Sequence, residues 1–227
     1  MLVRENEEEA VQVQKMRVLI MTSVEAERQA VLRGLQDQNR FDVCVAGVGS
    51  VLAAINTTKA VQSGDYDLVV NAGIAGGFIG RAGIGSLVVS QGIIAADLGA
   101  ESGEGFISVD ELGFGSSQIA VDAILSDRVT AALRAAELPV QSGLILTLST
   151  VTGTQETADS LASRYPTAVA EAMEGYGVAA AAASYGLPVL ELRSISNRIG
   201  PRNREAWRIP DALTALTAAF ARLEEVL

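Results

Sequence analysis

Short apolar runs that end in glycine-containing turns and lead into helical patterns recur along this chain, and they constrain its fold more than any other feature. Runs of this length suit strands buried on both faces of a sheet, and the segments between them carry apolar residues at helical spacing. The alternation predicts an α/β domain with a largely parallel central sheet. The predicted strands span residues 17–22, 41–46, 67–71, 86–94, 144–148 and 189–195, and the predicted helices span about 24–35, 51–63, 122–137, 154–165, 166–184 and 211–227.

The chain is interpreted as one folded domain, residues 16–227, with a short acidic extension before it. No internal repeat or low-complexity linker marks a further boundary, and a hydrophobic content of 49% supports a substantial core. Residues 1–15 contain four glutamates and are expected to form a solvated, disordered extension. Residues 99–115 are rich in glycine with scattered carboxylates, which makes them a candidate lid or specificity loop.

Composition excludes several classes of function. The formal net charge of −10 and the lack of Lys clusters argue against nucleic-acid binding, which depends on cationic contacts to phosphates. Because there is no His, acid–base chemistry must use carboxylates, and most zinc sites are excluded. The only cysteine, Cys44, lies in an apolar run, where a buried strand residue is expected rather than a nucleophile. No export signal or membrane-spanning run is visible, so a cytoplasmic protein is expected.

A polar segment follows the first predicted strand, at the sheet edge where ligands bind in open α/β folds. Thr22 and Glu25 predict a capping box that starts the next helix. Glu27 shares a helix face with Val24 and Val31, so its carboxylate is predicted to point inward. The alternative is a first-turn glutamate that stabilises the helix dipole and has no chemical role.

Two glycine-rich segments, residues 46–50 and 71–77, follow the second and third predicted strands. The first is superficially similar to a dinucleotide-binding turn, but Leu52 occupies the third glycine position, and the Lys of a phosphate-binding P-loop is missing. Two glycine turns at one sheet edge predict a small-molecule cleft. Packing alone could also demand these glycines, so both interpretations stay open.

A second polar pair stands in apolar surroundings. Glu174 follows Met173 within a stretch of Ala, Gly and Val, and Asn197 ends the apolar run that begins at Leu187. A carboxylate in such surroundings needs a partner. Each residue alone could be structural, as a satisfied core glutamate or a turn asparagine. Their pairing favours a functional site.

These motifs stand in the order found in the purine nucleoside phosphorylase and methylthioadenosine nucleosidase superfamily, which the chain resembles from residue 16 onward. The resemblance rests on residues 24–27, 47–49, 71–77, 173–174 and 193–197. It implies a single α/β domain, nucleoside phosphorylase-like, in which helices flank a central mixed, partly barrel-like sheet. It also implies a small-molecule nucleoside as partner and a homo-oligomer, at least a dimer.

Within the superfamily, residues 106–115 and 198–202 look most like those of the futalosine hydrolase family of menaquinone biosynthesis. That resemblance implies hydrolysis of the N-glycosidic bond of futalosine, with release of hypoxanthine and dehypoxanthine futalosine, and no metal or organic cofactor. Three alternatives stay open: a phosphorylase for inosine-like nucleosides, a methylthioadenosine nucleosidase, and a non-catalytic nucleoside-binding module.

The resemblance also implies roles for individual residues. Glu27 would be the base that activates water, Glu174 would bind the ribose hydroxyls, and Met173 would lie against the sugar. Asn197 stands where adenine-specific nucleosidases carry an Asp that helps to protonate the base at N7. Its amide would instead face the O6 and N7 of a 6-oxopurine. Thr152 would offer backbone contacts to the substrate.

The second glycine segment departs from the phosphorylases that the chain resembles. Gly73 and Ile74 are predicted to contact the substrate there, but Asn71 and Ile74 replace the Arg and Ser that hold phosphate. This disfavours phosphorolysis, although Arg28 or Arg81 could compensate.

Two further positions concern the base and the tail of the substrate. Val151 stands where the nucleosidases often place an aromatic against the purine. Arg202 belongs to a cluster of arginines after Asn197. It would bind the benzoate carboxylate of futalosine, or the cluster would be a solvated loop. The rest of that cluster is Arg198, Arg204 and Arg208.

Overall fold

The two longest strands of the sheet pair with each other and close it into a barrel. In the computed structural model, which describes residues 16–36 and 38–227, β3 (Leu68–Gly77) runs parallel to β10 (Val189–Arg198). The ring continues from β10 through β4 (Leu87–Ala95), β8 (Val140–Thr147) and β9 (Ala168–Ala172), which returns antiparallel to β3. Five strands therefore form a closed mixed barrel, which confirms the predicted fold class.

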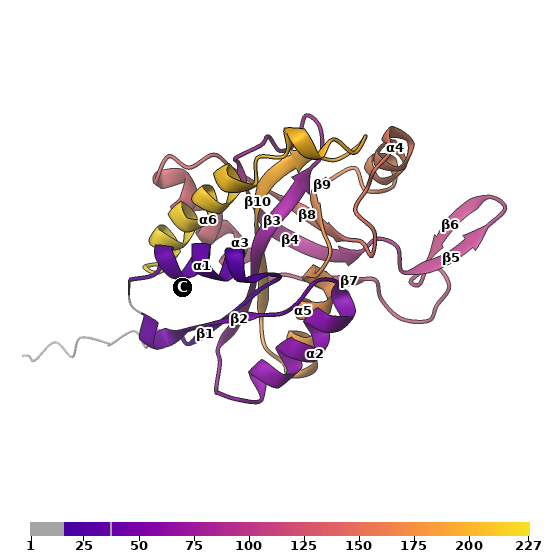
Figure 1. The fold of residues 1–227 in the computed structure, drawn as a ribbon. Helices are drawn as coiled ribbons and strands as arrows, with labels where there is room; N and C mark the ends of the chain where they lie inside the picture. Colours follow the sequence, from indigo (N-terminus) through magenta and orange to yellow (C-terminus); the bar gives the residue numbers. More distant parts are fainter. Residues whose placement is uncertain (1–15, 37) are drawn as a thin grey trace, which may run out of the picture.

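The remaining strands extend or decorate this barrel. Next to β3, β1 (Val18–Thr22) and then β2 (Phe41–Val45) continue the sheet as parallel strands. β7 (Gln118–Ala120) pairs with β4. β5 (Gly99–Ser102) and β6 (Gly105–Ser108) form a separate hairpin that projects from the body of the molecule (Figure 1). The segment predicted as a lid is therefore largely an ordered hairpin.

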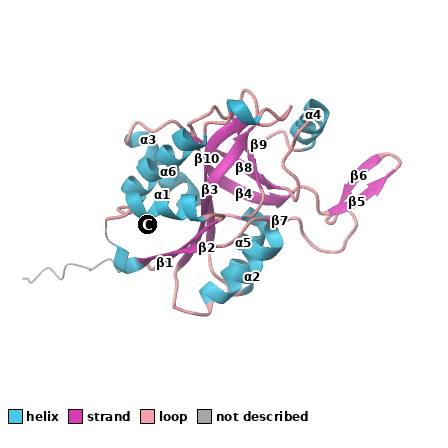
Figure 2. Cartoon of the chain, viewed as in Figure 1, coloured by secondary structure: helices cyan, strands magenta, loops and turns pink. Residues whose placement is uncertain are grey.

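Helices cover the sheet in two main groups (Figures 1 and 2). The C-terminal helix α6 (Ile209–Leu223) packs on α1 (Glu25–Gly34), and α3 (Ala123–Ala135) contacts α6 on the same side. The second and fifth helices pack against each other on another side. None of the helices in the described residues is long and apolar enough to cross a membrane. The helices are α1 (Glu25–Gly34), α2 (Ser50–Val61), α3 (Ala123–Ala135), α4 (Gln155–Arg164), α5 (Gly175–Ser184) and α6 (Ile209–Leu223).

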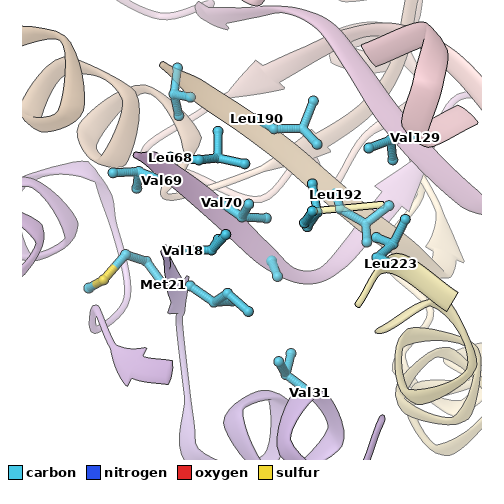
Figure 3. Close-up of a cluster of buried hydrophobic side chains, with 14 of the residues drawn as sticks. Val18, Met21, Val31, Leu68, Val69, Val70, Val129, Leu190, Leu192 and Leu223 are labelled. Carbon is cyan, nitrogen blue, oxygen red and sulfur yellow. The ribbon is translucent and has the colours of Figure 1, made fainter. Parts of the chain in front are cut away.

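The main hydrophobic core lies between the sheet and the helices. Figure 3 shows Leu192 of β10 beside Leu223 of α6, and Val70 of β3 and Val31 of α1 belong to the same cluster of buried side chains. Each of these four side chains is completely buried. Burial of a side chain of this size contributes about 1.5–3 kcal/mol, so this core holds α1 and α6 firmly against the strands that build the site.

Two sequence predictions about secondary structure are wrong. The predicted helix over residues 166–184 is β9 followed by α5, because pairing with β8 and β3 overrides the helical propensity of an Ala-rich segment. The predicted glycine turn at residues 71–77 is the second half of β3, which runs without a break to Gly77. Only the first glycine segment is a turn, where Gly47 and Gly49 have φ of 85° and 89°. The predicted acidic extension, residues 1–15, lies outside the described residues.

Candidate active site

A cavity of about 300 Å³ is lined by residues at the ends of β1 and β9 and by residues of β3 and β10, where the pairing of β10 with β3 is irregular. Three glutamates line it, and its described lining includes no Lys or Arg. The remaining lining is mostly apolar, so the cavity suits an uncharged ring system held by a few polar groups. The lining residues are Ser23, Val24, Glu27, Val48, Ile74, Ala75, Gly76, Val151, Glu171, Ala172, Met173, Glu174, Ser196, Asn197 and Trp207.

Glu27 is held at the cavity by three backbone amides. Its Oε2 accepts hydrogen bonds from the N–H of Ser23 at 2.8 Å and of Val24 at 3.2 Å, and its Oε1 accepts from Ile74 N–H at 2.8 Å. The side chain is 3% exposed, as its helix face predicts. Burial raises the pKa of Glu27 above its usual value, although Arg193 and the amides oppose the shift.

The helix that carries Glu27 starts differently from the prediction. α1 begins at Glu25, and Val24 rather than Thr22 is its N-cap. The carboxylate that reaches back to the N-cap amide belongs to Glu27, not to Glu25. Glu25 instead binds Arg28 and Gln29 on the surface. The predicted Thr22–Glu25 capping box is therefore wrong, because the strand continues through Thr22 and the helix starts later.

A buried cation connects the glutamates beneath the cavity. Arg193 is completely buried, and its Nε donates to Glu191 Oε1 at 2.8 Å, while its Nη2 donates to Glu174 Oε2 at 3.3 Å. Glu174 Oε1 also accepts from the N–H of Gly49 at 3.1 Å, and Asn71 Nδ2 donates to Glu191 Oε1 at 3.1 Å. Glu174 thus has the partner that its apolar surroundings require.

Glycines leave room for these charged side chains. A Cβ on Gly73 would lie 2.6 Å from Glu27 Oε1 and 2.7 Å from Arg193 Nη1. A Cβ on Gly175 would lie 2.2 Å from Glu191 Oε2. Gly73 itself is not part of the cavity lining. Its position under the charged cluster explains why β3 carries glycine within a regular strand.

Asn197 also lines the cavity, just after an irregularity in the pairing of β10 with β3. Its Oδ1 accepts from Ser196 Oγ at 2.8 Å, and its Nδ2 donates to the carbonyl of Arg198 at 3.1 Å. The NH₂ group has two hydrogens and only one goes to Arg198, so the second is free to donate to a ligand. Met173 and Ile74 line the same cavity.

Thr152 is paired with a glutamate that the sequence did not single out. Its N–H donates to Glu171 Oε1 at 2.8 Å, and its hydroxyl donates to Glu171 Oε2 at 2.6 Å. Glu171 is 5% exposed and lines the main cavity, and burial raises its pKa. The N–H of Thr152 is thus engaged by Glu171, and the predicted backbone contact of Thr152 with the substrate stays a prediction.

A second cavity of about 300 Å³ adjoins the first and shares Asn197 and Trp207 with it. Arg202 lines this second cavity, with its guanidinium 5.4 Å from the centre of the Trp207 ring. Arg198 also lines it, whereas Arg208 is paired with Asp211 on the surface. The predicted arginine cluster is therefore divided between this cavity and the surface.

The two arginines considered as phosphate ligands are engaged elsewhere. Arg28 forms an ion pair with Glu25 at 2.8 Å. Arg81 donates to the carbonyls of Ala162, Tyr165 and Ala168. Neither side chain lines the main cavity, so neither arginine is placed to compensate for the missing phosphate ligands.

Sequence reasoning missed four residues of the site: Glu171, Glu191, Arg193 as a cation, and Trp207. Glu171 was hidden inside the segment predicted as a helix. Glu191 and Arg193 carried a signal, because opposite charges two residues apart in a strand buried on both faces must find partners. Trp207 lies in a loop, where no periodicity could place it.

Comparison with known proteins finds relatives that match most of this chain. The model of the phosphorylase superfamily matches residues 7–227. The futalosine hydrolase of Streptomyces coelicolor is 47% identical, over 93% of this chain and 97% of its own. That of Acidothermus cellulolyticus is 48% identical, over 90% and 89%.

Solved structures share the fold at low sequence identity. The futalosine hydrolase of Helicobacter pylori superposes with a TM-score of 0.81 at 17% identity, over 93% of this chain and 98% of that one. A methylthioadenosine/S-adenosylhomocysteine nucleosidase from Neisseria meningitidis, in complex with methylthio-immucillin-A, gives 0.79 at 19% identity, over 92% and 99%.

Proposed function

This chain belongs to the phosphorylase superfamily, and from its similarity to the futalosine hydrolases we propose that it is an N-glycosyl hydrolase that acts on futalosine. The reaction breaks the bond between the sugar C1′ and the purine N9. Water supplies the hydroxyl group that replaces the base, and hypoxanthine and dehypoxanthine futalosine are the products. This is the step of menaquinone biosynthesis that the resemblance implies.

The observation that carries the proposal is the Glu27 carboxylate, buried at the cavity and fixed by three amide donors. A carboxylate with a raised pKa is a better proton acceptor than an ordinary one. We assign Glu27 as the base that takes a proton from the attacking water as the water oxygen bonds to C1′.

Glu174, a second glutamate of the cavity, is suited to bind the sugar. As the base departs with the bonding electron pair, positive charge develops on the sugar ring, and carboxylates nearby stabilise it. We assign Glu174 to the ribose hydroxyls, since its orientation is fixed by Gly49 and Arg193. Met173 would lie against the apolar face of the sugar, and Ile74 beside it.

Asn197 is assigned to the departing purine. Its NH₂ group can donate to O6 or N7 of a 6-oxopurine as negative charge builds on the base. Asn cannot give up a proton. The hypoxanthine, which leaves with the bonding electron pair, therefore takes its proton from solvent. Arg202 lines the second cavity, and we retain it as a candidate ligand for the substrate carboxylate.

Water is favoured over phosphate as the nucleophile by the charge of the cavity. The described lining holds three glutamates and no cation, and the nearby Arg193 is bonded to Glu191 and Glu174. A phosphate dianion needs cationic or multiple amide donors, which here already hold Glu27.

The proposal is tested by incubating the protein with futalosine in phosphate-free buffer and following hypoxanthine release. We expect full activity, and the variant Glu27→Gln should lose about a hundredfold or more of kcat while keeping its unfolding temperature. Release that requires phosphate and yields a sugar phosphate would support a phosphorylase instead. Full activity of Glu27→Gln would remove Glu27 from the mechanism.

We also propose that the protein is a homodimer formed through α2. Five apolar side chains in and before this helix are between 40% and 73% exposed, and one of them, Val48, also lines the cavity. A second copy seated on this patch would cover both the patch and the cavity mouth. The patch consists of Val45, Val48, Val51, Leu52 and Ile55.

Light scattering tests the dimer. The unmodified protein should have twice the mass of one chain, and Leu52→Asp should reduce it to one. Ile124→Asp is the matched control, because Ile124 is 80% exposed on α3 and outside the patch. A single-chain mass for the unmodified protein would contradict the proposal.

We further propose that residues 16–227 form one catalytic domain. We also propose that the protein is cytoplasmic, and cell fractionation can check this location.

A further inference from the structure

Glu171 is the one glutamate of the main cavity that the mechanism above does not use. Unlike Glu174, it has no salt bridge to a cation among the described residues, and its recorded partner is Thr152. A buried carboxylate without a cation is costly, so its retention at a cavity wall calls for an explanation.

Strand register places Glu171 beside Asn197. Asn197 is the register partner of Gly76 on one side, and Glu171 is the register partner of Gly76 on the other. A Cβ on Gly76 would lie 3.0 Å from Ile199 Cγ1, 3.4 Å from Asn197 Nδ2 and 3.5 Å from Glu171 Cγ. The missing side chain therefore lets the two polar groups approach the same residue of β3, and both residues line the main cavity.

The hydrogen bonds define what each group offers to that space. Asn197 Oδ1 accepts from Ser196, and one Nδ2 hydrogen goes to the Arg198 carbonyl, so the other Nδ2 hydrogen is the donor available to the cavity. Thr152 donates both its N–H and its hydroxyl to Glu171. Glu171 therefore offers carboxylate oxygens as acceptors to the cavity, and the N–H of Thr152 is not available as a donor. Whether Glu171 is ionised or protonated on Oε2, Oε1 keeps a lone pair that can accept.

The Asn197 donor next to the Glu171 acceptor matches the edge of a 6-oxopurine that carries O6 and N1–H. In a 6-oxopurine, the acceptor O6 is adjacent to the donor N1–H, whereas adenine presents a donor amino group adjacent to an acceptor N1. We propose that Glu171, held by Thr152, accepts the N1–H of the purine while Asn197 donates to O6, so that the pair selects 6-oxopurines over adenine. This inference rests on the proposed function for the placement of the base next to Asn197.

Direct binding of free bases, measured by calorimetry, tests this role without catalysis. The unmodified protein should bind hypoxanthine more tightly than adenine. Glu171→Met removes the acceptor and frees the Thr152 N–H to face the adenine N1, so the preference should fall about tenfold to a hundredfold. Glu171→Gln keeps one oxygen and should reduce the preference less. Glu156→Met, on the exposed first turn of α4, is the matched control and should change nothing.

The outcomes separate the inference from the function on which it rests. If a folded Glu171→Met variant keeps the preference of the unmodified protein, the role of Glu171 is refuted. If Glu171→Met does not fold, Glu171→Gln decides: an unchanged preference there refutes the role equally. If the unmodified protein does not hydrolyse futalosine, the proposed function fails, whichever base the protein binds.

Discussion

Removal of Arg193 should destabilise the protein strongly, and the loss should depend on pH. The guanidinium is completely buried, with hydrogen bonds of 2.8 Å to Glu191 and 3.3 Å to Glu174. Replacing it by Met keeps most of the volume but leaves carboxylates without their cation. Breaking a buried pair in this way costs about 3–5 kcal/mol of unfolding free energy, which is a large part of the stability of a domain of this kind.

The pH dependence follows from Glu191. Burial already raises its pKa in the folded protein, and the loss of Arg193, which opposes that shift, raises it further. A carboxyl group with a folded pKa above its unfolded pKa stabilises the fold when protonated, and this stability is lost as the pH rises through the folded pKa. The deficit of Arg193→Met should therefore be larger in mildly alkaline than in mildly acidic buffer.

Urea unfolding followed by circular dichroism measures both effects. The double variant Arg193→Met, Glu191→Gln should recover part of the stability, because one of the stranded carboxylates is gone. Arg28→Met is the control, since the ion pair of Arg28 with Glu25 lies at the surface and should contribute nothing measurable. The reasoning is refuted if Arg193→Met unfolds like this control, or if its deficit is the same at both pH values.

Two further predictions concern activity. Because burial raises the pKa of Glu27, which must be ionised to accept a proton, kcat/KM for futalosine should fall on acidification at a pH above the usual carboxyl value of 4.5; a profile that stays flat through that region would argue against Glu27 as the base. Gly73→Ala places a Cβ 2.6 Å from Glu27 Oε1, so hydrolysis should drop about tenfold or more in a protein that still folds, whereas Gly83→Ala, where a Cβ meets nothing within 4 Å, should retain activity.

The sequence predicted the parts of this site that follow from local patterns. Glu27 was found because its helix face is set by 3.6-residue periodicity, and Glu174 and Asn197 because polar residues among apolar ones need partners. The five-strand barrel agrees with the family resemblance rather than with periodicity, which predicted only a largely parallel sheet.

The remainder depended on long-range pairing. The segment around Glu171 has a helical composition, and only its position between β8 and β3 makes it a strand. In the same way, Gly73 and Gly76 look like turn residues in the sequence, but they serve a continuous strand that must admit neighbouring side chains. Contacts between residues so far apart in the chain leave no local signal.

The closure of the barrel by β10 has a consequence for the order of events during synthesis. β10 is the last strand of the chain, yet it inserts between β3 and β4, which the ribosome releases about a hundred residues earlier. Until it arrives, the nascent sheet has two open edges, and the carboxylate of Glu174 lacks the guanidinium that β10 brings. Completion of the fold and completion of the active site are thus a single late event, so a chain stalled before β10 has neither.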